Sequence, residues 1–420
     1  MSWRETTLGE ITDLKRGFDL PKSQRLQGDV PVYSSSGITG SNSTAAVEGP
    51  CVITGRYGTI GEVFFSGGPC WPLNTALYST EFNGNNPRFV YYLLQTIPWQ
   101  GYTTASAVPG VNRNHVNLCP VKIPDRATQD AIVEVLDSIV DKIALNNRLN
   151  DYLANLCETI ASRYCNDRNS RLRDICYQVA DHVDYDNANQ ETYVSTESLM
   201  QNKGGRQLAS SLPTTGKITR YKAGDTLISN IRPYFKKIWY APFEGTCSGD
   251  VIVFRANDPS NAPYLHACLR QDSFFDYVMQ GAKGTKMPRG DKKQMMEFKV
   301  ASSCSAEDLI LLDSVIKQRS DNDSEITKLQ KLRDTLLPKL MSGEIDVSKI
   351  DLTQLTNNHL LVRGHNVPNR YWKEPLWKPS LIVFCRRCRT CLIRHSSNIW
   401  PKYSESRCCQ LRKHQRRRIC

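Results

Sequence analysis

Two long stretches of the chain have the spacing of apolar residues that is typical of amphipathic helices. Over 127–164 apolar residues recur at steps of three and four, and the stretch contains neither Gly nor Pro. This pattern predicts one helix of about 37 residues, roughly 55 Å long. A second stretch with similar spacing covers 306–341 and is followed by Gly343, a residue favoured just beyond a helix end.

Both predicted helices carry the same apolar seam, displaced by 176 residues. Residues 136–140 and 312–316 share the order Leu-Asp-Ser followed by two β-branched residues. Asn146 and Asn322 occupy the same heptad a position, where a buried Asn lowers stability and fixes the register of paired helices. We expect an antiparallel coiled coil in which these two residues set the register. The alternative is two unrelated amphipathic helices, each docked on its own domain.

Short β-prone runs separated by Gly, Ser, Asn and Pro fill the segment before each predicted helix. The run 223–229 echoes 48–54, which indicates that the second segment repeats the first. The predicted fold class is α+β, with two pseudo-repeated β-rich α/β domains separated by two long antiparallel coiled-coil helices. The predicted boundaries are 1–125 for the first domain, 126–167 for the first helix, 168–304 for the second domain, 305–347 for the second helix and 348–420 for a basic, Cys-rich tail.

The net charge of +12 comes from the last part of the chain. Residues 348–420 hold 16 of the 54 Lys and Arg residues and only three of the 42 acids, so the remainder is nearly neutral. A nearly neutral body that binds nucleic acid needs local basic patches or a partner. We expect the tail to form no packed domain. An alternative is a zinc site in the tail, although the spacing of its possible ligands matches no paired Cys-x-x-Cys knuckle; these are Cys385, Cys388, Cys391 and His395, with Cys408 or Cys409.

Sequence features also indicate the compartment. No apolar run approaches the roughly 20 residues that span a bilayer, and the N-terminal residues lack the pattern of a secretory signal. We therefore expect a cytoplasmic protein without membrane contact, in which the nine cysteines before the tail are reduced.

Five segments carry distinctive motifs, namely 30–37, 53–61, 108–113, 141–150 and 331–345. Over about 1–347 these motifs resemble those of the specificity (S) subunits of type I restriction–modification systems. The resemblance implies that each β-rich domain is a target-recognition domain for one half of a split, asymmetric site in double-stranded DNA. It also implies that the helices set the gap between the halves and dock two modification subunits, which use S-adenosylmethionine to methylate adenine. Motor–nuclease restriction subunits would join for cleavage, and ATP and Mg are expected on the partner subunits.

Candidate DNA contacts follow from the chemistry of base recognition, in which Arg and Lys suit guanine edges and Asn suits adenine. Each predicted domain has two loops that offer such groups. In the first domain the candidates are Arg56, Tyr57, Arg113 and Asn114, and in the second they are Asn230, Arg232, Lys236, Lys237, Lys286 and Arg289. The alternative for the lysines is a solvated surface, and for the tyrosines a place in a domain core.

The sequence lacks the motifs expected of the catalytic subunits. No Gly-x-x-x-x-Gly-Lys-Ser/Thr loop for ATP is present, nor is the Asn/Asp-Pro-Pro-aromatic motif of adenine methyltransferases. The possible nucleophiles Ser195 and Cys247 have no identifiable base beside them. We therefore expect a noncatalytic chain with no cofactor of its own. Two alternatives remain open: an autonomous DNA-cleaving enzyme, and a coiled-coil scaffold that does not read DNA.

Overall fold

Two long helices dominate the part of the chain that the structure describes, which is residues 3–103, 110–164 and 169–350 of a computed structural model. Helix α4 spans Arg126–Arg163 and helix α9 spans Ala306–Ser342, close to the predicted bounds. The side chains of Asp125 and Ser305 accept hydrogen bonds from backbone N–H groups in the first turns of α4 and α9. Helix α9 ends at Gly343, whose φ of 77° belongs to the left-handed region that glycine adopts readily.

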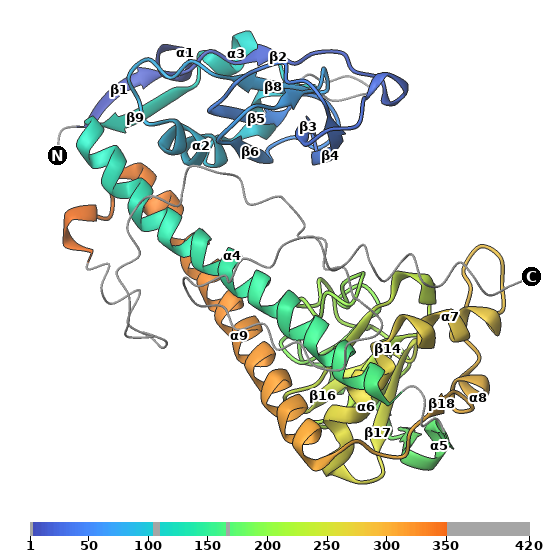
Figure 1. The fold of residues 1–420 in the computed structure, drawn as a ribbon. Coiled ribbons are helices and arrows are strands. Elements are labelled where there is room, and N and C mark those ends of the chain that lie inside the picture. Colours follow the sequence, from blue (N-terminus) through green and yellow to red (C-terminus); the bar gives the residue numbers. More distant parts are fainter. Residues whose placement is uncertain (1–2, 104–109, 165–168, 351–420) are drawn as a thin grey trace, which may run out of the picture. The chain divides into compact units, whose positions relative to one another are not determined.

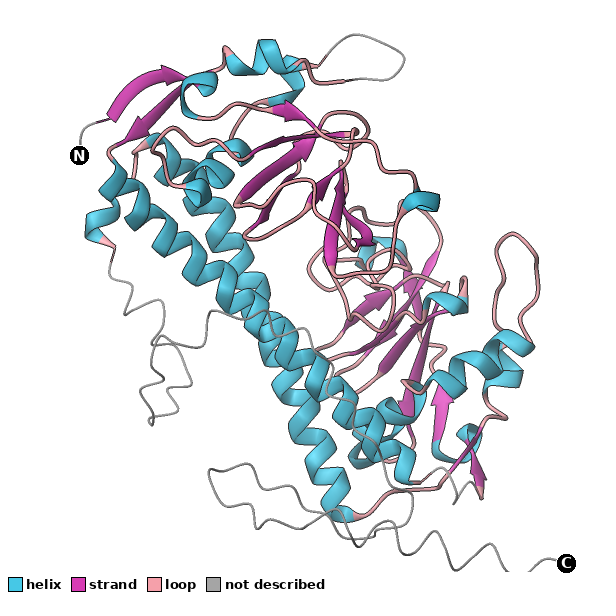
Figure 2. Ribbon diagram, turned by 45° about the horizontal axis from the view of Figure 1, so that its top comes forward, coloured by secondary structure: helices cyan, strands magenta, loops and turns pink. Residues whose placement is uncertain are grey.

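The two helices lie side by side and run in opposite directions (Figures 1 and 2). Near the end of α4, Arg163 Nη1 donates to Asp308 Oδ1 at the start of α9, at 2.8 Å. Near the middle, Asn146 Nδ2 donates to Glu325 Oε2 at 2.7 Å. The two helices are therefore antiparallel, with the end of α4 beside the start of α9.

The middle of the helix interface is polar. Asn146 and Asn322 are only 2% and 4% exposed, but they do not bond to each other. Asn322 Nδ2 instead donates to Asn150 Oδ1 at 2.8 Å, and Asn150 Nδ2 donates to Asp323 Oδ1 at 2.7 Å. Asn150 was not predicted as a partner, because the position in α9 that matches it in the shared seam is Ile326. The role of Asn146 and Asn322 in setting the register stays a prediction.

Both ends of the helix pair are apolar, and each end belongs to a different hydrophobic core. Leu136 of α4 and Leu340 of α9 lie in the core of the first β-rich segment. Ile160 of α4 and Leu312 of α9 lie in the core of the second segment. Each helix therefore supplies side chains to both cores.

The first β-rich segment contains three small sheets and three short helices. A four-stranded sheet has the order β2-β8-β5-β6, a three-stranded sheet has the order β4-β3-β7, and β1 pairs with β9. The strands are β1 Trp3–Thr7, β2 Lys15–Arg16, β3 Val30–Ser34, β4 Gly37–Asn42, β5 Cys51–Gly55, β6 Val63–Ser66, β7 Trp71–Pro72, β8 Ala76–Ser79 and β9 Pro120–Pro124, and the helices are α1 Leu8–Ile11, α2 Pro87–Gln95 and α3 Arg113–Asn117.

The second β-rich segment has sheets of the same three sizes. Its four-stranded sheet has the order β11-β17-β14-β15, its three-stranded sheet has the order β12-β13-β16, and β10 pairs with β18. The strands are β10 Ser170–Arg171, β11 Cys176–Gln178, β12 His182–Asp184, β13 Lys217–Tyr221, β14 Thr226–Ser229, β15 Ile238–Tyr240, β16 Gly245–Cys247, β17 Val251–Ala256 and β18 Lys299–Val300, and the helices are α5 Leu172–Ile175, α6 Ala262–Leu269, α7 Asp272–Gln280 and α8 Lys292–Met295.

The described residues all belong to one compact unit, so the predicted division into domains within it stays a prediction. The tail beyond residue 350, including the possible zinc ligands, lies outside the described residues. None of the described helices has the length and apolar character that crossing a membrane requires. The eight described cysteines are free thiols, as expected for them.

Replacing Tyr164 by Phe should destabilise the pairing of α4 with α9. The Tyr164 hydroxyl donates to Asp308 Oδ2 at 2.7 Å and accepts from the Ser305 N–H at 2.9 Å, so its loss removes both hydrogen bonds and leaves Asp308 with its partner Arg163 alone. We expect a decrease of about 1–3 kcal/mol in the free energy of unfolding, measured by urea denaturation. Tyr152→Phe is the matched control, because Tyr152 lies on α4, the helix that Tyr164 caps, and is 72% exposed. Equal stabilities of the two variants would contradict the prediction.

Candidate nucleic-acid interface

In the first segment the structure brings together the two loops that the sequence marked as basic. The turn that starts at Arg56 follows β5, a central strand that is buried along its whole length. The Val111 N–H donates to the carbonyl oxygen of Arg56 at 2.9 Å, and Tyr57 forms an antiparallel bridge with Gly110. The β5 turn and the loop that leads into α3 therefore lie beside each other.

The side chains of Arg56 and Tyr57 form a stack in this turn. The Arg56 guanidinium carbon lies 4.6 Å from the centre of the Tyr57 ring, which is a cation–π contact. The ring is 38% exposed and lies against Gly110, where an added Cβ would be 2.3 Å from the Tyr57 ring. Glycine at position 110 thus leaves the space that the stack needs. The stack holds the guanidinium in place before any ligand binds.

Arg113 and Asn114 are exposed in the first turn of α3. The side chain of Asn112 caps this helix by accepting from the Asn114 N–H at 3.0 Å. One guanidinium nitrogen of Arg113 donates to the Leu14 carbonyl oxygen at the long distance of 3.5 Å. Arg113 and Asn114 therefore project from a short, capped helix and not from a long loop. This helix sets the direction of the remaining Arg113 donors and of the Asn114 amide.

The second segment repeats this pairing of a turn with a basic loop. Its turn starts at Asn230, after the central strand β14, which is also fully buried. The Arg232 N–H donates to the Pro288 carbonyl oxygen at 2.8 Å, and Ile231 bridges to Arg289. The predicted contact residues of the β14 turn and of the 283–290 loop are therefore neighbours.

Lys286 and Arg289 are the exposed candidates of the second segment. An Arg289 guanidinium nitrogen lies 3.1 Å from Asp250 Oδ1, and the Asp250 carbonyl oxygen accepts from the Asn230 N–H at 2.8 Å. Asp250 thus connects the turn to the loop. Asp250 was not among the residues predicted from the sequence, although its place in a Gly-Asp turn just before β17 is a usable signal.

The other four candidates of this segment are partly or fully buried, and two of them have partners within the protein. Lys236 Nζ lies 2.8 Å from Asp272 Oδ1. Lys237 Nζ donates to the Thr196 carbonyl oxygen at 2.6 Å, and burial lowers the pKa of this amine. Asn230 is only 7% exposed, and Arg232 is half-buried with a left-handed φ of 50°. Contact of these side chains with DNA stays a prediction.

The surroundings of Ser195 and Cys247, the two possible nucleophiles, indicate structural roles for both residues. Ser195 Oγ accepts from the Ser198 N–H at 3.0 Å and so caps a local turn. Cys247 is fully buried, and burial raises the pKa of its thiol to about 12. In the described residues, no group of three or more His, Cys, Asp or Glu side chains is placed to hold a metal ion.

Comparison with known families agrees with the resemblance predicted from the sequence. Residues 1–155 match the model of the type I restriction modification DNA specificity domain. The predicted resemblance to type I specificity subunits is thereby confirmed.

Individual relatives extend the likeness over most of the chain. The chain is 19% identical over 408 residues to the specificity subunit of the type I restriction enzyme EcoDI from Escherichia coli, covering 82% of this chain and 89% of that protein. It matches the crystal structure of a type I restriction–modification S subunit from M. genitalium with a TM-score of 0.51 and 15% identity, over 81% of this chain and 96% of that one. The HsdS subunit from Thermoanaerobacter tengcongensis matches with a TM-score of 0.29 and 14% identity, over 82% and 97%. The chain shares its mixed helix-and-sheet fold with the M. genitalium subunit.

Replacing Gly110 by Ala should displace the Tyr57 ring and break its stack with Arg56. We expect a decrease of about 1 kcal/mol in the free energy of unfolding, because an added Cβ overlaps the ring. The double variant Gly110→Ala/Tyr57→Ala should lose less stability than the sum of the two single variants, in a double-mutant cycle measured by urea denaturation. Gly101→Ala is the control, since a Cβ there meets nothing within 4 Å. Additive effects in the cycle would show that the ring and Gly110 do not interact.

Proposed function

We propose that this chain is the noncatalytic specificity subunit of a type I restriction–modification complex, and that it reads a bipartite, asymmetric site in double-stranded DNA. One observation carries the proposal. In both β-rich segments a fully buried central strand ends in a turn, and that turn is bonded through its backbone to a second loop with basic residues. Loops held on a rigid sheet are a common way to present binding residues.

The two β-rich segments act as two target-recognition domains that repeat one design. The sizes of their sheets and the position of β5 and β14, third in each four-stranded sheet, support this repetition. Their loop residues differ, because Arg56 stacks on Tyr57 in the first segment and Arg289 pairs with Asp250 in the second. Unlike loops on a common frame favour two unlike half-sites.

The helix pair serves as an antiparallel coiled-coil spacer that keeps the two readers at a fixed separation. Its ends belong to different hydrophobic cores, so each reader is attached through packed side chains rather than through a flexible linker. Half-sites read from one face of DNA would lie about one helical turn apart, roughly 34 Å.

Catalysis belongs to partner subunits in this proposal. Two modification subunits with S-adenosylmethionine would methylate adenine, and motor–nuclease subunits with ATP and Mg would cleave DNA, in the cytoplasm. The nearly neutral charge of 1–347 supports a need for such partners, because this part of the chain lacks the excess of basic residues that strong DNA binding requires. The family description and the name of the EcoDI relative support the same assignment.

Substitutions in the two segments should affect different halves of the DNA site. Arg56→Ala should reduce discrimination in one half-site and Arg289→Ala in the other, each by about 5–150-fold, because a good Arg–guanine contact contributes about 1–3 kcal/mol. The measurement is mapping of methylated adenines, with binding competition, for the chain assembled with its modification subunits. Lys122→Ala is the control, because Lys122 is an exposed basic residue on β9 whose ammonium group lies 3.0 Å from the Glu5 carboxylate.

These variants and an assay of the isolated chain separate the alternatives. A scaffold that does not read DNA would leave both half-sites unchanged in the Arg56 and Arg289 variants. An enzyme would methylate or nick DNA as the isolated chain, in the presence of S-adenosylmethionine or Mg²⁺. Either result would overturn the proposed function.

A further inference from the structure

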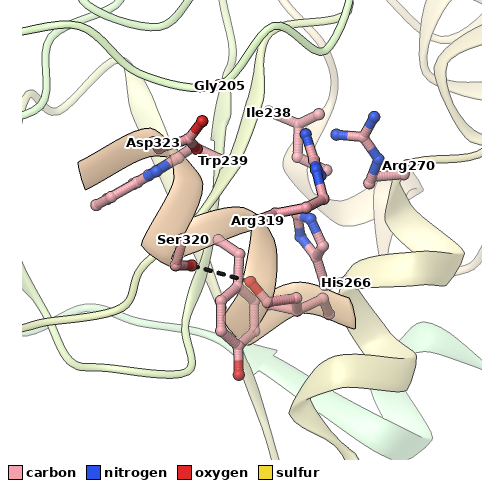
Figure 3. Close-up of a pocket in the computed structure, with 10 residues that line it drawn as sticks. Gly205, Ile238, Trp239, His266, Arg270, Arg319, Ser320 and Asp323 are labelled. Carbon is pink, nitrogen blue, oxygen red and sulfur yellow. Dashed lines mark hydrogen bonds between the residues drawn. The ribbon is translucent and has the colours of Figure 1, made fainter. Parts of the chain in front are cut away.

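Two arginines face each other in a small pocket between helix α9 and the second β-rich segment. Arg319 of α9 and Arg270, the residue that follows α6, line this pocket together with His266 of α6 (Figure 3). The pocket encloses about 20 Å³, which is enough for a single water molecule or small ion.

Arg270 is nearly completely buried, at 3% exposed. Its closest acid is Glu158, at 3.6 Å from one guanidinium nitrogen. This carboxylate is already 2.9 Å from Lys203 Nζ. A second guanidinium nitrogen donates to the Lys203 carbonyl oxygen at 3.3 Å, and Nε has no hydrogen-bond partner among the described residues. Burial and the neighbouring Arg319 lower the pKa of Arg270 to about 10.

Arg319 is half-buried, and within the described part of the chain it has neither a hydrogen bond nor an ion pair. The acid that should pair with it is Asp323, one helical turn further along α9. Asp323 instead accepts a hydrogen bond from Asn150 of α4 at 2.7 Å. In Figure 3 the Arg319 guanidinium is turned toward Arg270. Asp323 also lines the pocket and interacts electrostatically with both arginines.

His266 cannot balance this charge. It is 1% exposed and its Nδ1 lies 3.2 Å from Thr226 Oγ1. Burial lowers the pKa of His266 well below its usual range, so the ring is neutral. Two acids thus lie near the two guanidinium groups: Glu158 is shared with Lys203, and Asp323 interacts with both arginines electrostatically without an ion pair in the described residues. Burial of a guanidinium group without a direct partner is unfavourable.

We propose that this pocket binds a chloride-sized anion between Arg270 and Arg319. Guanidinium N–H groups are strong donors to anions. Both arginines line the pocket, and among the described residues Arg319 has neither a hydrogen bond nor an ion pair. The anion would link α9 to α6 and so stabilise the attachment of the second β-rich segment to the helix pair. This inference is independent of the proposed DNA specificity.

Chloride should stabilise the full chain beyond the effect of ionic strength. We expect the Tm in KCl to exceed the Tm in potassium glutamate at equal ionic strength by about 2–4 °C, and the difference to saturate with chloride concentration. Equal Tm values in the two salts would overturn the proposal.

Two variants locate the effect. Arg319→Met removes the guanidinium group and keeps an unbranched apolar stem, so it should abolish the chloride-dependent part of the Tm. In glutamate Arg319→Met should be at least as stable as the unmodified chain. Lys317→Met is the matched control, because Lys317 is a basic residue on the same helix, is 73% exposed and pairs with Asp313. The Lys317→Met variant should retain the full chloride effect. Retention of the effect by Arg319→Met, or its loss in Lys317→Met, would contradict the site.

A direct measurement of binding complements the stability data. The ³⁵Cl NMR line should broaden in the presence of the full chain and should sharpen on addition of excess bromide. The broadening should be absent with Arg319→Met, and also with Arg270→Gln if that variant retains its folded circular dichroism spectrum. A line width equal to that of buffer would mean that water alone occupies the pocket, and the proposal would be wrong.

Discussion

The antiparallel pairing of α4 and α9 is the interaction on which the rest of the structure depends. Leu136 and Leu340 are 204 positions apart in the sequence and yet belong to one core. Ile160 and Leu312 join in the same way in the other core. Neither β-rich segment can complete its core with its own residues alone, because each uses one end of both helices. The helix pair therefore supports both segments as well as connecting them.

The pairing combines apolar ends with a polar middle, and the two parts have different physical roles. The apolar ends supply burial, which is non-directional and tolerates small shifts along the helix. The buried amides of Asn150 and Asn322 in the middle are directional, since a shifted register would leave donors and acceptors without partners. The hydrogen bond from Asn150 also directs one oxygen of Asp323 toward α4, and Asp323 lies one helical turn from Arg319. The polar centre of the helix pair and the charged groups beside the second segment thus share this residue.

The candidate interface depends on order that starts inside the sheets. Strands β5 and β14 are held on both sides by neighbouring strands, so the turns that follow them begin at fixed places. Backbone hydrogen bonds then attach a second loop to each turn. The internal partners of Lys236 and Lys237 show that a basic residue in such a loop is not automatically available to DNA. The exposed groups, among them Arg113, Lys286 and Arg289, form a smaller set than the basic residues of the loops.

The sequence by itself determined the two long helices, their shared seam, the β-rich character of the segments between them, and the loops with candidate DNA-binding residues. These features depend on local spacing and on turn chemistry, which involve residues close together along the chain. Only the tertiary structure decided that Asn146 bonds to Glu325, that Asp250 pairs with Arg289, and that Arg319 faces Arg270. Such partners lie tens to hundreds of residues apart, and they meet because packing of the helices and sheets brings them together. Hydrophobic periodicity specifies which face of a helix is buried, but it contains no information about which distant polar group meets that face.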